Sequence, residues 1–228
     1  MQTNTYEGLH IIHNSQSIRM DELVVEAPLQ ININSKAYSV VMRTPNNDKD
    51  LVFGLLYAED IYKNPSSIPL EIIKEEYGIP SIVNVTIPTN VLGKGYLNKR
   101  TLLSVSSCGI CGKQQLEDLK VSGDKIVKKV SFSSESLLHM FGTLQKHQET
   151  FKKTGGSHAA GIFDKKFQLL TIREDIGRHN AVDKCVGSLL LKDHLKNGMY
   201  LLVSGRVSYE IVSKAFLAKM QVNVAVSA

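Results

Sequence analysis

Two cysteines separated by two residues form the most reactive grouping in this sequence. Cys108 and Cys111 lie in the run SSCGICGK at 106–113, which follows a β-prone run at 101–105 and precedes a helix-prone run at 114–119. The amides and macrodipole of a helix N-terminus favour thiolate over thiol, and Lys113 adds a positive charge. The flanking glycines let a partner molecule come close. The pattern therefore indicates a nucleophilic cysteine on an accessible loop.

Two other interpretations of the cysteine pair are weaker. A structural zinc site needs four ligands, and the chain has no second C-x-x-C; Cys185 and separated histidines would have to complete it. A thioredoxin-like dithiol normally follows the first strand of its domain, whereas about a hundred residues precede Cys108. Cys185 itself shares a predicted apolar helix face with Ala181 and Leu189, so we expect it in the core. We assign no metal site.

Three polar turns indicate a binding site for an anionic ligand. Paired glycines at 155–156 would let backbone amides approach a phosphate, and Arg178 and His179 stand at a predicted helix start, where a phosphate is favoured. Asp175 could accept hydrogen bonds from a purine-like ring or orient His179. We expect the three turns to enter helices at the carboxyl edge of an α/β sheet. The predicted binding residues are Gly155, Gly156, His158, Asp175, Gly177, Arg178, His179, Asn180, Ser204, Gly205 and Arg206.

The charge distribution agrees with a compact phosphorylated ligand. The 228 residues carry a net charge of +5, but residues 1–105 have 9 basic and 11 acidic residues, whereas residues 106–228 have 18 and 11. The basic residues are scattered and tryptophan is absent, so we predict no nucleic-acid partner. No apolar run approaches the roughly 20 residues that span a bilayer, and the N-terminus lacks the pattern of a signal peptide. We therefore expect a cytoplasmic protein that does not bind membranes.

The chain divides into two predicted domains. Residues 1–104 form a small β-rich α+β domain: extended runs at 23–33 and 37–42 suggest a hairpin, a helix begins near Asp48, and short strands follow at 68–74 and 81–87. Residues 105–228 form an α/β domain, because strands at 159–163, 168–172, 199–204 and 222–226 alternate with helices at 133–147, 180–191 and 210–220.

Five sequence motifs together resemble the FdhD family, a family of sulfur carriers required for formate dehydrogenase activity. The motifs are MRTP at 42–45 with Asp48 and Glu59, SVSSCGICGK at 104–113, GGSHAAGIFD at 155–164, REDIGRHNAVDK at 173–184, and LVSGRVSYEIVSKA at 202–215. The resemblance implies that a cysteine desulfurase loads sulfur onto a cysteine of the C-x-x-C motif as a persulfide. It further implies that the sulfur reaches the molybdenum bis(molybdopterin guanine dinucleotide) cofactor before this cofactor enters formate dehydrogenase.

The resemblance also implies a fold and an assembly. The family is similar in fold to cytidine deaminases, so we expect residues 105–228 to form a cytidine-deaminase-like three-layer α/β/α domain, in a protein that forms a homodimer. Zinc deaminases need H-x-E followed by P-C-x-x-C. Here Ala160 stands where the glutamate would be and the C-x-x-C precedes His158, so deamination is not predicted. Members of the family usually continue with a further helix and strand beyond the run at 222–226.

Two functions from different classes remain open. In the first, the protein is a sulfurtransferase in which Cys108 carries the persulfide, and Cys111 relays the sulfur or resolves the persulfide as a disulfide. In the second, it is a non-catalytic chaperone that binds and delivers the molybdenum cofactor, and the thiols anchor or protect that cargo. In both, guanine nucleotides such as GDP are partial mimics of the bound cofactor.

Overall fold

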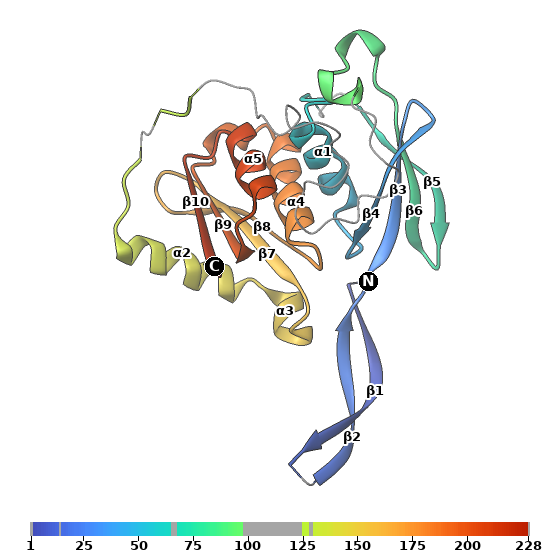
Figure 1. The fold of residues 1–228 in the computed structure, drawn as a ribbon, viewed down its shortest axis with the longest axis vertical. Coiled ribbons are helices and arrows are strands. Elements are labelled where there is room, and N and C mark those ends of the chain that lie inside the picture. Colours follow the sequence, from blue (N-terminus) through green and yellow to red (C-terminus); the bar gives the residue numbers. More distant parts are fainter. Residues whose placement is uncertain (1, 14, 65–67, 98–124, 128–129, 228) are drawn as a thin grey trace.

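A computed structural model describes residues 2–13, 15–64, 68–97, 125–127 and 130–227 (Figure 1). The predicted nucleophile loop at 106–113 lies outside these residues, as do the β-prone run at 101–105 and the helix-prone run at 114–119. The described strands are β1 (Thr3–Ile12), β2 (Ser15–Val24), β3 (Ala27–Ile33), β4 (Lys36–Arg43), β5 (Leu70–Glu76), β6 (Ile79–Val85), β7 (His158–Phe163), β8 (Leu169–Asp175), β9 (Tyr200–Arg206) and β10 (Val222–Ser227). The described α-helices are α1 (Asp48–Ala58), α2 (Ser134–Lys146), α3 (Glu149–Thr154), α4 (Arg178–Leu191) and α5 (Tyr209–Leu217), with short 3-10 turns at 89–91, 94–97 and 195–197.

The first four-stranded sheet has the order β4-β3-β6-β5 and carries α1 on one face. The hairpin β3–β4 turns at Asn34 and Ser35, which both have positive φ, and β6 then adds parallel to β3. Inward residues alternate along β3, where Leu29, Ile31 and Ile33 are fully buried against the apolar face of α1. This sheet and helix therefore share one hydrophobic core.

The second four-stranded sheet has the order β10-β9-β7-β8 and is covered on both faces. Ala160 and Ile162 of β7 pack with α4 and α5, whereas Ala159 and Phe163 face the opposite side and pack with α2. Strand β7 runs antiparallel to both β8 and β9, and β9 runs parallel to β10. The result is an α/β/α layer arrangement, with α1 and the first sheet stacked beyond α4 (Figure 1).

Helices α1 and α4 meet at their backbones. A Cβ atom on Gly54 of α1 would lie 1.9 Å from the carbonyl oxygen of Asp183, and one on Gly187 of α4 would lie 1.8 Å from that of Asp50. Such distances are shorter than any van der Waals contact, so the two glycines are what allow the helices to approach this closely. The pair joins the half of the chain before residue 98 to the half after residue 124.

Most of the predicted elements are confirmed, within two or three residues at their ends. The hairpin, the helix beginning at Asp48, and the alternating strands and helices after residue 130 all occur. The extended run predicted at 23–33 is instead divided between β2 and β3, and the β1–β2 hairpin and α3 were not predicted. The domain boundary expected at 104–105 falls outside the described residues, so that division stays a prediction.

Candidate functional site

Three polar turns converge at one edge of the second sheet. Because β7 is antiparallel to its neighbours, its first residue lies beside the last residues of β8 and β9, and His158 pairs with Asp175. The backbone amide of Ala159 donates to Ser204 Oγ at 2.9 Å. Gly205 lies so close that a Cβ there would be 3.2 Å from His158 Nδ1 and 3.4 Å from Arg178 Cδ. The predicted turns therefore form one site around His158, Arg178 and Gly205.

The glycine pair at 155–156 has a different local function from the one expected. Gly155 ends α3 with a left-handed φ of 63°, and its amide donates to the carbonyl of Phe151 at 2.7 Å. The Gly156 amide donates to Thr154 Oγ1 at 3.1 Å. This turn enters a strand, β7, so the expectation that all three turns enter helices is wrong. Since both amides already donate within the loop, they are not available to cradle a phosphate in this conformation.

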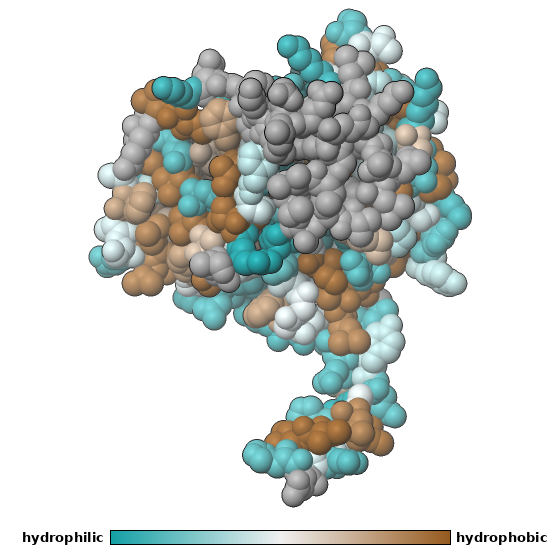
Figure 2. All heavy atoms as spheres, in the orientation of Figure 1, coloured by the Kyte–Doolittle hydropathy of each residue, from teal (hydrophilic) through white to brown (hydrophobic). Residues whose placement is uncertain are grey.

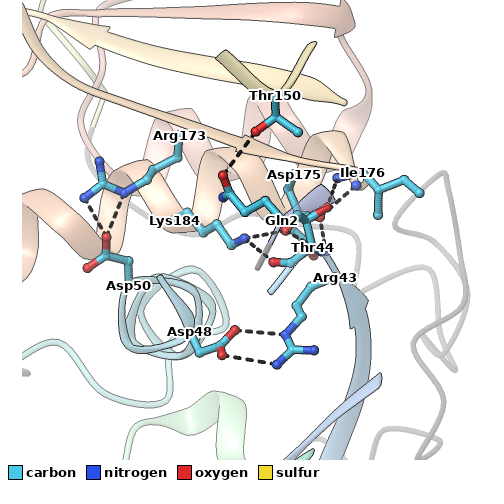
Figure 3. A network of polar contacts seen from close by, with 12 residues as sticks. Gln2, Arg43, Thr44, Asp48, Asp50, Thr150, Arg173, Asp175, Ile176 and Lys184 are labelled. Carbon is cyan, nitrogen blue, oxygen red and sulfur yellow. Dashed lines mark hydrogen bonds and ion pairs between the residues drawn. The ribbon is translucent and has the colours of Figure 1, made fainter. Parts of the chain in front are cut away.

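Asp175 lies beneath the site and is fully buried. Its Oδ1 accepts from the Gly177 amide at 2.8 Å and from Asn180 Nδ2 at 3.0 Å. Its Oδ2 accepts from the Thr44 amide at 3.1 Å and pairs with Lys184 Nζ at 2.6 Å (Figure 3). Neither oxygen contacts His179 in these bonds. The geometry makes Asp175 a residue that positions the turn at 176–179, rather than one that touches a ligand.

The same turn is fixed to the end of β4 by further bonds. Asn180 Nδ2 donates to the carbonyl of Met42 at 2.8 Å, the Ile176 amide donates to Thr44 Oγ1 at 3.0 Å, and Lys184 Nζ donates to the carbonyl of Thr44 at 2.7 Å. Thr44 and Lys184 were not among the predicted site residues. One signal was present, since Asp183 and Lys184 interrupt an otherwise apolar helix segment, which is typical of buried ion pairs.

His179 is held by side chains at the start of α5. Its Nε2 lies 2.9 Å from Ser208 Oγ, and its Nδ1 lies 3.5 Å from a carboxylate oxygen of Glu210. Burial lowers the pKa of His179 to about 4, although the Glu210 carboxylate opposes that shift. These contacts fit a neutral ring that accepts from the Ser208 hydroxyl and directs Nδ1–H toward Glu210.

Lys214 continues this chain of contacts into the core. Its ammonium donates to both carboxylate oxygens of Asp183 at 2.8 Å and lies 3.4 Å from Glu210. Burial alone would lower the pKa of Lys214, but the carboxylates of Asp183 and Glu210 outweigh it and raise that pKa. Lys214 is therefore a permanent cation that holds Glu210 in place beside His179.

The positive charge of the site comes from arginine rather than histidine. Burial, followed by the nearby Arg178 guanidinium, lowers the pKa of His158, so both site imidazoles are neutral at pH 7. Arg178 opens the 14-residue helix α4, after Gly177 as its N-cap, and Arg206 is exposed at the end of β9. Two guanidinium groups and a helix N-terminus favour a phosphate-bearing ligand at this edge.

The predicted nucleophiles, Cys108 and Cys111, lie outside the described residues. Cys185 is confirmed as a core residue: it is fully buried, its thiol donates to the Ala160 carbonyl at 3.0 Å, and burial raises its pKa to about 12. Among the residues that the structure describes, no cluster of three or more His, Cys, Asp or Glu side chains could hold a metal ion. None of the helices in those ranges is long and apolar enough to cross a membrane.

The fold and the polar cluster define a class of protein: an α/β protein with a basic, polar cluster at a sheet edge, fixed by a buried ion pair and hydrogen bonds to a second small sheet. Within this class, the chain belongs to the FdhD/NarQ family, whose family model matches residues 24–228. A sulfur carrier protein FdhD from Thermoplasma acidophilum is 39% identical over 214 residues, covering 91% of this chain and 75% of that protein. One from Mycobacterium tuberculosis is 35% identical over 234 residues, covering 96% and 83%.

A solved structure shares the fold. It is the crystal structure of a candidate formate dehydrogenase accessory protein from Desulfotalea psychrophila, and it matches with a TM-score of 0.73 over 100% of this chain and 85% of that one. The two sequences are 19% identical. The match establishes that the mixed α/β architecture, with its separate sheets, occurs in another protein.

Proposed function

We propose that this protein is a sulfur carrier that serves formate dehydrogenase, acting in the cytoplasm as a homodimer. Relatives at 33–39% identity are named sulfur carrier protein FdhD, and the C-x-x-C motif supplies a nucleophile of the required kind. The structural observation that supports the proposal best is the convergence of His158, Arg178 and Gly205 at one sheet edge. That edge suits an anionic cargo, to which sulfur would be delivered.

The loading step is a sulfane-sulfur transfer. The Cys108 thiolate attacks the outer sulfur of a persulfide on a cysteine desulfurase, a new S–S bond forms, and the desulfurase cysteine leaves as a thiolate. The step is redox-neutral because one S–S bond replaces another. Cys111 then either attacks the outer sulfur and carries it as its own persulfide while Cys108 leaves as a thiolate, or attacks the inner sulfur to form a Cys108–Cys111 disulfide and releases hydrosulfide.

The proposed cargo is the molybdenum bis(molybdopterin guanine dinucleotide) cofactor. Arg178, Arg206 and the start of α4 would bind its phosphates, while neutral His158 and His179, with Ser204, would offer hydrogen bonds at the same edge. Asp175, Gly177 and Asn180 position this turn from below, and Gly205 leaves room for close approach. A cytidine-deaminase-like fold for residues 105–228 is part of the proposal.

Mass spectrometry tests the carrier function directly. Incubation with a cysteine desulfurase and cysteine should add about 32 Da, one sulfur atom, to the peptide that contains Cys108. Cys108→Ala should abolish this adduct and dehydrogenase activation, while the matched control Cys185→Ala should keep both, because its thiol is buried and protonated. A Cys108→Ala protein that fully activates the dehydrogenase would leave the cofactor chaperone as the better description.

Calorimetry tests the cargo site. GDP should bind more tightly than ADP, and its affinity should fall as the salt concentration rises, because arginine–phosphate contacts are screened. Arg178→Gln should weaken GDP binding about tenfold or more, whereas Lys166→Gln, on the exposed β7–β8 turn, should not change it. Equal affinity for GDP and ADP would contradict a dedicated guanine site.

A further inference from the structure

The β1–β2 hairpin, called the arm below, projects from the body of the protein (Figure 1). Its two ten-residue strands pair with each other over their full length and join neither four-stranded sheet. At its base the Val25 amide donates to the Gln2 carbonyl, Thr150 Oγ1 donates to Gln2 Oε1, and Val24 lies against Gly156. Ten residues of strand reach about 30 Å, so the arm extends well beyond this attachment.

One face of the arm carries a cluster of apolar side chains that are exposed to solvent. Leu9 pairs directly with Ile18, and Ile11 and Met20 lie two residues further along their strands, on the same face. Their exposed fractions are 61%, 69%, 60% and 63%, and apolar surface is visible on the arm in Figure 2. An isolated two-stranded hairpin is marginally stable in water, and contiguous apolar patches mark interaction sites. The arm therefore requires a covering surface.

Charge identifies the covering surface. Residues 3–24 carry Glu7, Asp21 and Glu22 against Arg19, a net charge of −2, while the rest of the chain carries +7. The negatively charged arm of one subunit would be attracted to the positively charged body of a second subunit. The arm of the second subunit would be attracted to the body of the first in the same way. A two-fold axis satisfies both contacts with one type of interface.

We propose that the arm of each subunit packs on the body of a second copy of this chain. The receiving surface is formed by α2 and α3, where Leu138 and Phe151 are 71% and 45% exposed, and where the exposed lysines 146, 152 and 153 outnumber the exposed acids Glu135 and Glu149. Because the base of the arm contacts α3, a two-fold axis near α3 lets each arm run along the α2–α3 surface of its partner. This inference rests on the proposed homodimer and adds the structural element that forms the contact between the two subunits.

Sedimentation equilibrium of the full chain tests the arm. The native protein should weigh twice 25.3 kDa, and the double variant Leu9→Thr/Ile18→Thr should raise the dimer dissociation constant about 10- to 100-fold. Threonine favours strands, so the hairpin itself is kept. Leu138→Gln on the receiving surface should have an effect of the same kind. The matched control is Ile72→Thr/Ile73→Thr on edge strand β5, whose side chains are 54% and 58% exposed; it should dimerise like the native chain.

The possible results distinguish the proposed role of the arm from the existence of the homodimer. A native dimer that the arm variant leaves equally tight would overturn the arm inference while the homodimer stands. A native chain that is monomeric at about 100 μM would overturn both, because association depends on protomer concentration. Unchanged far-ultraviolet circular dichroism spectra of both double variants show that any loss of dimer comes from the surface and not from misfolding.

Discussion

At the scale of single residues, the polar groups of the site divide into those that face outward and those that hold the site from beneath. Asp175 and Lys184 belong to the second kind: their side chains are fully buried, and their 2.6 Å ion pair is surrounded by bonds to Thr44, Gly177 and Asn180. Removing one member of such a pair leaves an uncompensated buried charge.

Asp175→Ala should therefore lower the free energy of unfolding by about 3–5 kcal/mol, as measured by urea denaturation. The matched control is Asp193→Asn, where the side chain is 92% exposed, its ion pair with Lys196 spans 3.5 Å, and asparagine tolerates the backbone φ of 54°. That change should have little effect, because exposed ion pairs are screened by water. Equal destabilisation by the two substitutions would show that the buried carboxylate of Asp175 contributes no more to the free energy of unfolding than an exposed one.

The protonation of His179 gives a prediction about pH. Its pKa of about 4 in the folded protein lies below the ordinary 6.5, so the unfolded chain takes up the proton first. The stability that neutral His179 contributes is complete above pH 6.5 and is lost as the pH falls toward 4. Nuclear magnetic resonance of the His179 ring should show no titration between pH 8 and 6. The His179→Gln variant should have a flatter dependence of stability on pH from 6.5 to 4.

At the scale of elements, the contact between α1 and α4 depends on two glycines. Gly54→Ala should lower the free energy of unfolding by more than about 3 kcal/mol, because the added methyl group would overlap the Asp183 carbonyl and force the helices apart. Gly142→Ala in α2 is the control, since nothing lies within 4 Å of its added Cβ. It should stabilise the protein by about 0.5–1 kcal/mol through helix propensity. Similar urea midpoints for the two variants would contradict the close helix contact.

Elements with clear runs of apolar residues could be predicted from the sequence, and others could not. Helix α1 and strand β9 each carry an unbroken run of buried residues. The arm has apolar residues on both faces, mixed with charges, and thus lacks the simple alternation of a half-buried strand. Helix α3 has six residues, and its start is capped by Glu174, which accepts from the amides of Thr150 and Phe151. Because the capping residue lies 23–24 positions away in the chain, the sequence around α3 has no local signal for the start of this helix.

The sequence indicated which turns form the site, but it did not indicate how the side chains of these turns contact one another. Clusters of glycine, arginine and histidine at strand ends located His158, Arg178 and Gly205 correctly as neighbours. The buried role of Asp175 depends on Thr44, which lies 131 residues earlier in the chain. No periodic pattern reports a contact between residues so far apart, so Asp175 was interpreted as a ligand residue.

At the scale of the whole molecule, the two sheets are tied together by α1 against α4 and by Thr44 against the turn at 175–177. We expect one cooperative unfolding transition for the body. Hydrogen exchange should give similar protection for Val83 in the first sheet and Leu202 in the second, both buried strand residues. In the monomer, amides of the arm should exchange far sooner. Distinct protection of the two sheets would show that they unfold separately.

The backbone contact of Gly54 with Gly187 also limits how this protein can recombine with its relatives. The two glycines lie 133 positions apart in the chain, on opposite sides of the segment at 98–124. A hybrid that takes its first part from one parent and its second from another inherits the glycines separately. If either parent has a larger residue at the matching position, its hybrid meets a steric conflict that neither parent has. Compatibility between parents is thus decided at this pair, independently of how well the exposed surfaces match.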